Sequence, residues 1–263
     1  MLLPGDRSGV FVAHRKAVNR VWKLESTYTP GFATRVQQAL RTLWPSHCAL
    51  CAQTGQPGFD LCVGCEGDLP LNDHGCEHCA EPLPREIVRP ALCGACLSHP
   101  PAFDACVAPF RYAFPVDRMI QGLKYRRQLY YGRILGQLLS KYVAHREMRP
   151  ELVIPVPLAT ARYRERGFNQ ARELARPLCK SLGLRLCGDL IERRRDTREQ
   201  AGLDRKERLK NTRDAFALLA PLPARHVAII DDVVTTGSTV NEVAKLLRGA
   251  GAEWIEVWAA ARA

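Results

Sequence analysis

Thirteen consecutive residues, 227–239, constrain the fold of this chain more than any other stretch. Four apolar residues, three of them β-branched, open the run and predict a buried strand of a parallel sheet. We expect this strand to end at two adjacent acids, Asp231 and Asp232, both ionised at neutral pH. A small, hydroxyl-rich turn around Gly237 follows, and then a helix with one apolar face, formed by Val240, Val243, Ala244 and Leu247.

The turn and the two acids together predict the kind of ligand. In an open α/β sheet, ligands bind beyond the carboxyl ends of the strands, and a helix N-terminus offers unpaired N–H groups to a phosphate. Two carboxylates repel a bare phosphate, but they suit the hydroxyl donors of a ribose. We therefore expect a sugar phosphate, with its diol on Asp231 and Asp232 and its 5′-phosphate on residues 235–239. The run contains neither a P-loop nor a dinucleotide fingerprint.

The whole run closely resembles the 5-phosphoribosyl-1-pyrophosphate (PRPP) binding motif of type I phosphoribosyltransferases. The shared pattern is four apolar residues, two acids, two apolar residues and Thr-Thr-Gly-Ser-Thr. A strand that ends in an Asx turn with a Ser or Thr cap explains one acid and one hydroxyl, but not the run as a whole. The resemblance assigns PRPP binding to Asp231, Asp232, Val233, Thr235, Thr236, Gly237, Ser238 and Thr239.

Cysteine spacing predicts a second unit. Eight of the eleven cysteines form four C-x-x-C pairs: Cys48/Cys51, Cys62/Cys65, Cys76/Cys79 and Cys93/Cys96. The two sulfurs of each pair can occupy one edge of a zinc tetrahedron, and such repeats favour zinc and a reducing, cytoplasmic compartment over a disulfide framework. We expect two four-cysteine zinc sites built from sequential pairs, with an interleaved cross-brace as the alternative. Few apolar residues occur here, so zinc must supply much of the folding free energy.

Pattern and composition divide the chain into three parts. Residues 1–44 are basic and poor in acids, which fits a transit peptide or a disordered extension, and we favour the extension. Residues 45–100 hold the cysteine pairs, and residues 101–263 alternate strands with helices, which predicts a parallel α/β sheet. We expect strands at 105–112, 152–158, 216–218 and 254–259, and helices at 116–123, 131–145 and 171–178. No apolar run is long enough to span a membrane.

The distribution of basic residues is the last feature of the sequence that bears on binding partners. The net charge of +11 suggests an anionic partner such as nucleic acid or a polyphosphate, although a solvated basic surface would explain it equally. Residues 192–213 are the most charged stretch, and we expect a mobile loop that closes over a polyanion, with Arg195 and Arg208 as leading candidates. The basic and aromatic cluster 124–127 fits either a phosphate or nucleic-acid contact or a solvated loop.

Several segments in order resemble the ComF family, the competence or DNA-utilisation phosphoribosyltransferase-like proteins. The matching segments are the four C-x-x-C pairs, residues 122–125, 154–158 and 166–170, Thr197 with Gln200 and Leu203, and the run 227–239. They cover roughly residues 45–263. The resemblance implies an N-terminal double zinc ribbon and a C-terminal type I phosphoribosyltransferase domain. It also implies a link to natural transformation, in which single-stranded DNA enters the cytoplasm.

The resemblance leaves two classes of function open. As an enzyme, the chain would bind PRPP with Mg²⁺, place Pro155, Val156, Pro157, Leu158 and Arg166 around it, and transfer its ribose phosphate to an acceptor. Asp231, Asp232, Arg195 and Arg208 are then the catalytic candidates, and no residue stands out as the base that activates the acceptor. As a non-catalytic adaptor, the chain would sense PRPP or a nucleotide and hold single-stranded DNA or the DNA-uptake machinery. The ribbons could also serve only as a structural cap.

Overall fold

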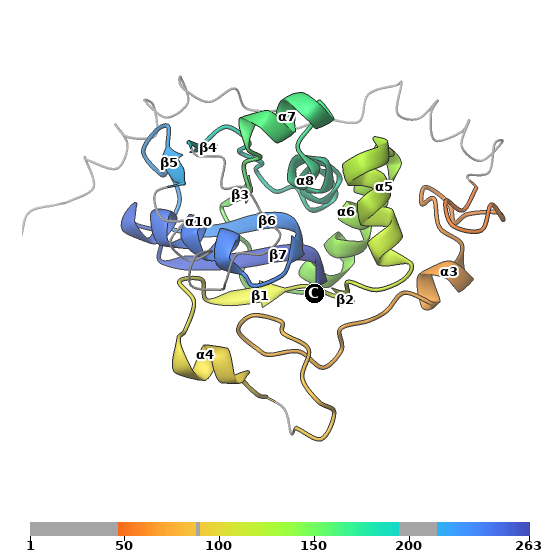
Figure 1. Cartoon of the computed structure of the whole chain (residues 1–263), viewed down its shortest axis with the longest axis horizontal. Helices are drawn as coiled ribbons and strands as arrows, with labels where there is room; N and C mark the ends of the chain where they lie inside the picture. Colours follow the sequence, from red (N-terminus) through yellow and green to blue (C-terminus); the bar gives the residue numbers. More distant parts are fainter. Residues whose placement is uncertain (1–46, 88–89, 195–214) are drawn as a thin grey trace, which may run out of the picture.

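A parallel sheet forms the centre of the molecule. The computed structural model describes residues 47–87, 90–194 and 215–263. Its sheet contains β1 (Ala105–Val107), β2 (Phe110–Arg111), β3 (Leu152–Pro155), β6 (His226–Val234) and β7 (Trp254–Arg262). The order is β1-β7-β6-β3, with β2 paired to the far end of β7, and every pairing in this sheet is parallel (Figure 1). The predicted parallel α/β fold is therefore confirmed.

Helices cover both faces of the sheet. On one face lie α5 (Val116–Arg126), α6 (Leu129–Val143) and α8 (Gln170–Leu182), and on the other lie α10 (Ser238–Gly249) and an antiparallel pair (Figure 1). The pair consists of β4 (Ile191–Arg193) and β5 (Phe216–Leu218). A short helix, α7 (Thr160–Arg166), follows β3. The side chains of β6 alternate between the two faces of the sheet. Ala228 and Ile230 face the first group of helices, while Val227 and Ile229 face α10.

A close helix contact stiffens the first face. Gly136 of α6 lies against α8, where a Cβ on this glycine would stand 2.3 Å from the carbonyl oxygen of Leu174. The missing side chain lets the two helix backbones approach, and the apolar residues of α6 and α8 then pack directly on β6 and β7. This packing fixes the position of the residues that α8 carries at its first turn.

Prolines and strand pairing determine where the strands near the site end. The strand expected at 105–112 is interrupted at Pro109, which has no N–H for the ladder, and β3 leaves the sheet after Pro155, where two prolines remove ladder donors. The expectation that the strand before the turn ends at the two acids is wrong. β6 continues to Val234, because β7 runs on beside it and pairs Asp231 with Ala259 and Val234 with Arg262.

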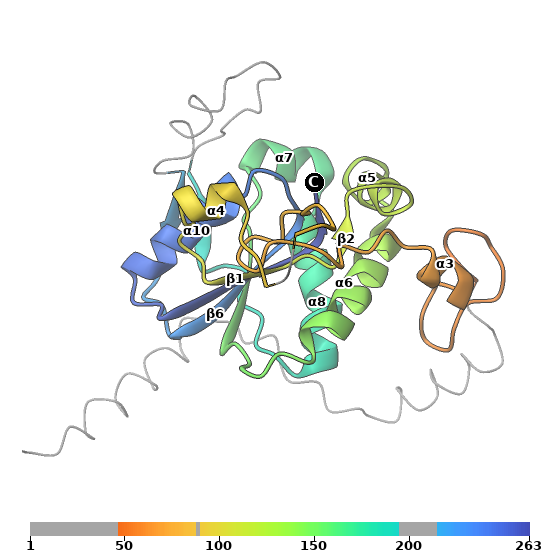
Figure 2. The ribbon, with the colours of Figure 1, turned by 90° about the horizontal axis from the view of Figure 1, so that it is seen from below.

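The cysteine region forms two small units that lie apart on this domain. The first ribbon, residues 48–67, includes α3 (Val63–Gly67) and packs on α6, where Arg133 pairs with Asp60 and Lys141 with Glu66. The second ribbon, residues 76–96, includes the start of α4 (Gly94–Ser98) and lies along the sheet edge near β1 and β2 (Figure 2). Residues 1–46, 88–89 and 195–214 lie outside the described residues, so Arg195 and Arg208 are not placed.

Candidate functional site

The turn after β6 has the form of an anion site. We call residues 235–239 the phosphate loop. Gly237 adopts φ +73°, a conformation that glycine takes readily, and α10 begins at the next residue. The Thr236 hydroxyl donates to Ser238 Oγ at 3.1 Å and accepts from the Ser238 N–H at 3.4 Å. Because the first N–H groups of a helix lack partners within it, this loop and helix start present donors to an anion.

The two acids lie at the base of this loop and have different surroundings. Asp232 is 3% exposed and faces the first group of helices, where Lys124 Nζ of α5 stands 2.5 Å from its Oδ2. Gln170, the first residue of α8, lies with its Nε2 at 3.5 Å from Asp232 Oδ1. Asp231 is partly exposed and accepts the backbone N–H of Asp232 at 2.9 Å. A lysine–aspartate ion pair is therefore part of the site.

Burial and mutual repulsion change the acid–base behaviour of the pair. Burial first, and the adjacent Asp232 carboxylate second, raise the pKa of Asp231 well above its usual value, although Lys124 acts against them. The pKa of Asp231 is thus higher than that of an ordinary carboxyl group, and its ionisation at neutral pH stays a prediction. Burial by itself would lower the pKa of Lys124, but attraction to Asp232 and Asp231 outweighs it and raises that pKa.

Arg166 joins the same network through Gln170. Arg166 ends α7 and is 7% exposed, and its Nη1 donates to Gln170 Oε1 at 3.1 Å. Its guanidinium also lies 5.4 Å from the ring centroid of Tyr125. The structure brings Arg166 to Asp232 through Gln170, and its contact with PRPP stays a prediction. Sequence reasoning left Lys124 undecided, and the signal for it was its place in the segment 122–125 that matches the ComF pattern.

The residues after β3 lie beside the acids. Pro155 pairs with Ile230, the Val156 N–H donates to the Ile230 carbonyl at 2.9 Å, and the chain then leaves the sheet at Pro157 and Leu158. Asn169 holds this turn, because its Nδ2 donates to the Val156 carbonyl at 2.9 Å while its Oδ1 caps α8. The structure thus brings the predicted 155–158 turn, the acids and the phosphate loop to one edge of the sheet.

The eight paired cysteines form two clusters with the geometry of metal sites. Cys48, Cys51, Cys62 and Cys65 form one, and Cys76, Cys79, Cys93 and Cys96 form the other, with the sulfurs of each within 4.8 Å of one another. Zinc bonded to four thiolates at about 2.3 Å keeps its sulfurs about 3.8 Å apart. The Sγ–Sγ separations of 3.6 Å for Cys51–Cys62 and 3.6 Å for Cys79–Cys93 fit that tetrahedron. Sequential pairing, rather than the cross-brace, is therefore confirmed.

The thiols of each cluster differ in acidity. Burial acts to raise the pKa of Cys48, but backbone N–H groups lower it to about 6, and in the same way they lower that of Cys76 to about 7. Burial and the neighbouring sulfurs raise the pKa of Cys65 and of Cys96. Four thiolates ionise together only beside a metal ion, and zinc suits such a set. All eleven cysteines are free of disulfides, as the prediction of a metal framework requires.

Comparison with known proteins agrees with this architecture. A family model described as a double zinc ribbon domain matches residues 39–97, and one described as a phosphoribosyl transferase domain matches residues 165–262. Competence protein F of Haemophilus influenzae is 38% identical over 213 residues, which cover 77% of this chain and 90% of that protein. DNA utilization protein YhgH of Escherichia coli O157:H7 is 35% identical over 224 residues, or 83% of this chain and 97% of that protein.

A more distant relative shares part of the chain. Competence protein ComFC of Streptococcus pneumoniae is 30% identical over 152 residues, which cover 58% of this chain and 60% of that protein.

Among the described residues, no helix has the length and the apolar run needed to cross a membrane.

Proposed function

The chain belongs to the ComF family, that of competence protein F and DNA utilization protein YhgH, and we propose that it binds PRPP as a phosphoribosyltransferase acting in DNA uptake or utilisation. A phosphoribosyltransferase domain and two four-cysteine clusters are present. The names of the relatives support a role in handling incoming DNA. We assign residues 45–100 to the double zinc ribbon and 101–263 to the phosphoribosyltransferase-like domain.

One observation carries the proposal. The acids and the phosphate loop, which belong to one continuous run, meet the distant 155–158 turn at the carboxyl ends of β3 and β6. In this arrangement Asp231 and Asp232 would accept hydrogen bonds from the ribose diol, and the N–H groups of residues 235–239 would hold the 5′-phosphate. The 155–158 turn is left for pyrophosphate, and Arg195 and Arg208 remain candidates to close over it.

Phosphoribosyl transfer breaks the bond between C1 and the pyrophosphate oxygen, and positive charge develops on the ribose ring. Fixed carboxylates on the diol orient the ring and favour that charge, while the phosphate loop holds the far end of the sugar. Mg²⁺ prefers oxygen ligands, which the carboxylates supply at this edge, and with PRPP it would offset the charge of the leaving pyrophosphate. Asp232 is held for this task by Lys124 and Gln170.

Calorimetric titration of PRPP with Mg²⁺ tests binding. The wild-type protein should bind PRPP, and the double substitution Asp231→Asn with Asp232→Asn should weaken binding at least a hundredfold while the zinc content stays at two ions per chain. Unchanged affinity in the double variant would refute the assignment. A screen of nucleobases, nucleosides and DNA ends for PRPP-dependent release of pyrophosphate then tests turnover.

A second candidate function is a non-catalytic adaptor for single-stranded DNA. The observation that favours it is an exposed aromatic and basic surface where α5 meets α7. Tyr125 is 70% exposed and Tyr163 52%, and Arg127 joins the two helices by donating to the Glu165 carbonyl at 3.0 Å. Aromatic faces beside arginines suit stacked bases and phosphates. Salt-sensitive binding of an oligodeoxythymidine, lost in Tyr125→Ala, together with no pyrophosphate release from any acceptor, would favour the adaptor.

A further inference from the structure

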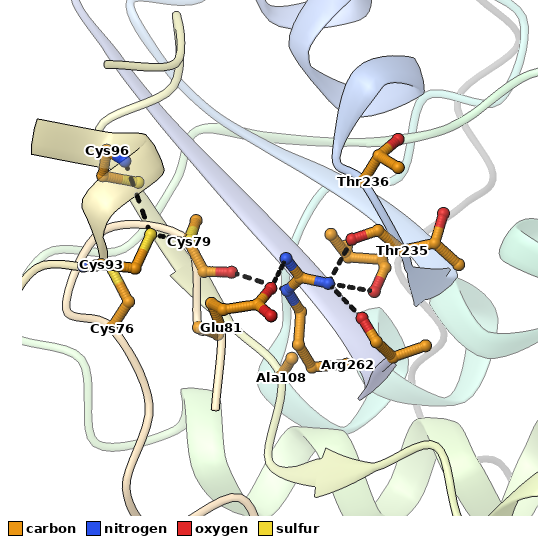
Figure 3. Close-up of polar contacts among 12 residues, drawn as sticks. Cys76, Cys79, Glu81, Cys93, Cys96, Ala108, Thr235, Thr236 and Arg262 are labelled. Atoms are coloured by element: carbon orange, nitrogen blue, oxygen red, sulfur yellow. Dashed lines mark hydrogen bonds and ion pairs between the residues drawn. The ribbon is translucent and has the colours of Figure 1, made fainter. Parts of the chain in front are cut away.

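A single buried arginine connects the second ribbon to the phosphate loop. Arg262, the last residue of β7, is 6% exposed and pairs with Val234, the last residue of β6. Figure 3 shows its guanidinium between Glu81 and Thr235. Its Nη1 donates to the carbonyl oxygens of Val234 at 3.0 Å and of Thr235. On the other side of the guanidinium, Nε donates to the Cys79 carbonyl at 3.1 Å, and Nη2 pairs with the Glu81 carboxylate.

These contacts set the direction of the loop backbone. In a trans peptide the C=O and the following N–H point in opposite directions. When Arg262 holds the Thr235 carbonyl, the Thr236 N–H therefore points away from the guanidinium, toward the exposed side of the loop. Donors aimed in this way before any ligand arrives are what an anion site needs.

The arginine depends in turn on the second ribbon. A buried guanidinium is stable only when its donors and its charge are satisfied, and two of its acceptors, Glu81 and the Cys79 carbonyl, belong to the chain around the second cluster. That chain is docked on the sheet edge: Asn72 Nδ2 donates to the Ala80 carbonyl at 2.8 Å and the Ala108 carbonyl at 3.1 Å. Without a metal, the cysteines that shape this turn would separate, and Arg262 would lose both acceptors.

The first ribbon offers a natural comparison, because it is anchored elsewhere. Its carboxylates Asp60 and Glu66 pair with Arg133 and Lys141 on α6. Tyr131 of the same helix donates to the Ala49 carbonyl at 3.5 Å. The two clusters therefore differ in what they support, although they share ligands and geometry.

We propose that Arg262 is a positioning residue for the phosphate loop and that it makes binding of the ribose 5-phosphate group depend on the metal of the second cluster, not of the first. The proposal rests on the proposed function, since it assigns that loop to the 5′-phosphate. It gives the second ribbon a role in substrate affinity, so that loss or oxidation of its thiolates would lower the affinity for the sugar phosphate.

Two probes separate positioning from general damage. Ribose 5-phosphate reports on the phosphate loop, and pyrophosphate with Mg²⁺ reports on the 155–158 turn. We expect Arg262→Lys and Cys96→Ser to weaken the binding of ribose 5-phosphate at least tenfold in calorimetry. Glu81 is half-exposed, and Glu81→Gln should weaken this binding at least threefold. The affinity for pyrophosphate should change less than twofold in all three variants. Zinc content should fall from two ions to one in Cys96→Ser and stay at two in the other variants.

Matched variants of the first ribbon serve as controls. Asp60→Asn and Cys65→Ser remove the corresponding carboxylate and ligand there, and both should leave ribose 5-phosphate affinity within twofold of wild type. Equal affinity in Cys96→Ser and Cys65→Ser, or equal loss of both probes in the second-ribbon variants, would overturn the inference. A wild-type protein that binds neither probe would overturn the proposed function itself, so the two failures are distinguishable.

Discussion

Replacing Lys124 by methionine removes the cation that faces Asp232 and keeps most of the side-chain volume. In the structure the ammonium is 2.5 Å from the carboxylate, the side chain of Lys124 is 21% exposed, and that of Asp232 is 4% exposed. The substitution therefore leaves a carboxylate enclosed by α5 and α8 with no positive partner. We expect the folded protein to lose stability, and the double variant with Asp232→Asn to regain most of it.

The size of the effect follows from this geometry. Two unit charges 2.5 Å apart attract by about 7 kcal/mol at an effective dielectric constant of 20, and the loss of solvation offsets a large part of this. Removal of one partner from a buried pair typically costs about 3 to 5 kcal/mol. Because Lys124 retains some contact with water, we take the lower end, about 3 kcal/mol for Lys124→Met, with a coupling energy of about 2 kcal/mol between the two positions.

Urea unfolding of the four proteins of the cycle measures this coupling, with saturating zinc in every sample so that the ribbons stay folded. Lys245→Met is the matched control, because the side chain of Lys245, which pairs with Glu242 on α10, is 53% exposed, and its loss should cost less than about 0.5 kcal/mol. A coupling energy below about 1 kcal/mol would refute a buried ion pair at this site. PRPP affinity should not recover in the double variant, since it lacks the carboxylate.

Three further predictions concern other parts of the molecule. Burial and Asp232 raise the pKa of Asp231 in the folded protein. The protonated carboxyl group therefore contributes stability that is complete below the pKa of the unfolded chain and is lost as pH rises through the pKa of the folded protein. Asp231→Asn should accordingly raise the melting temperature at neutral pH while it weakens PRPP binding. Gly136→Ala should cost about 3 kcal/mol in urea unfolding, because its Cβ meets the Leu174 carbonyl, whereas Gly249→Ala, with open space, should cost nothing. A strong chelator should release two zinc ions per chain, counted by atomic emission, and lower the melting temperature; release of fewer would contradict two filled clusters.

Local patterns explain why much of this fold could be predicted. The apolar positions of α5, Val116, Met119, Ile120 and Leu123, recur at helical spacing, and all four are buried. Each cysteine cluster closes within about twenty residues, so spacing alone indicated its membership. The phosphate loop is also a continuous segment, and its glycine adopts the positive φ that a tight turn before a helix requires.

The rest of the site depends on contacts between distant segments, which no local pattern encodes. Lys124 belongs to the cluster 124–127, which fitted a phosphate or nucleic-acid contact as well as a solvated loop. Nothing in the local sequence indicates that Asp232 comes to lie against it. Arg262 carries no sequence signal of its own, yet this last residue of the alanine-rich β7 is buried by the end of β6 and the second ribbon.

Lys124 and Arg262 both contact β6, which is longer than the sequence indicates. A strand that ended at the acids would leave the phosphate loop attached only through α10. Because β7 continues alongside to Arg262, the loop instead starts from a paired strand end whose carbonyls already have a charged donor. Sheet pairing thus extends the rigid part of the fold up to the first residue of the loop, and it carries the second ribbon's influence to the same point. The order of affinities among the ribbon variants tests this reasoning more directly than any measurement of overall stability.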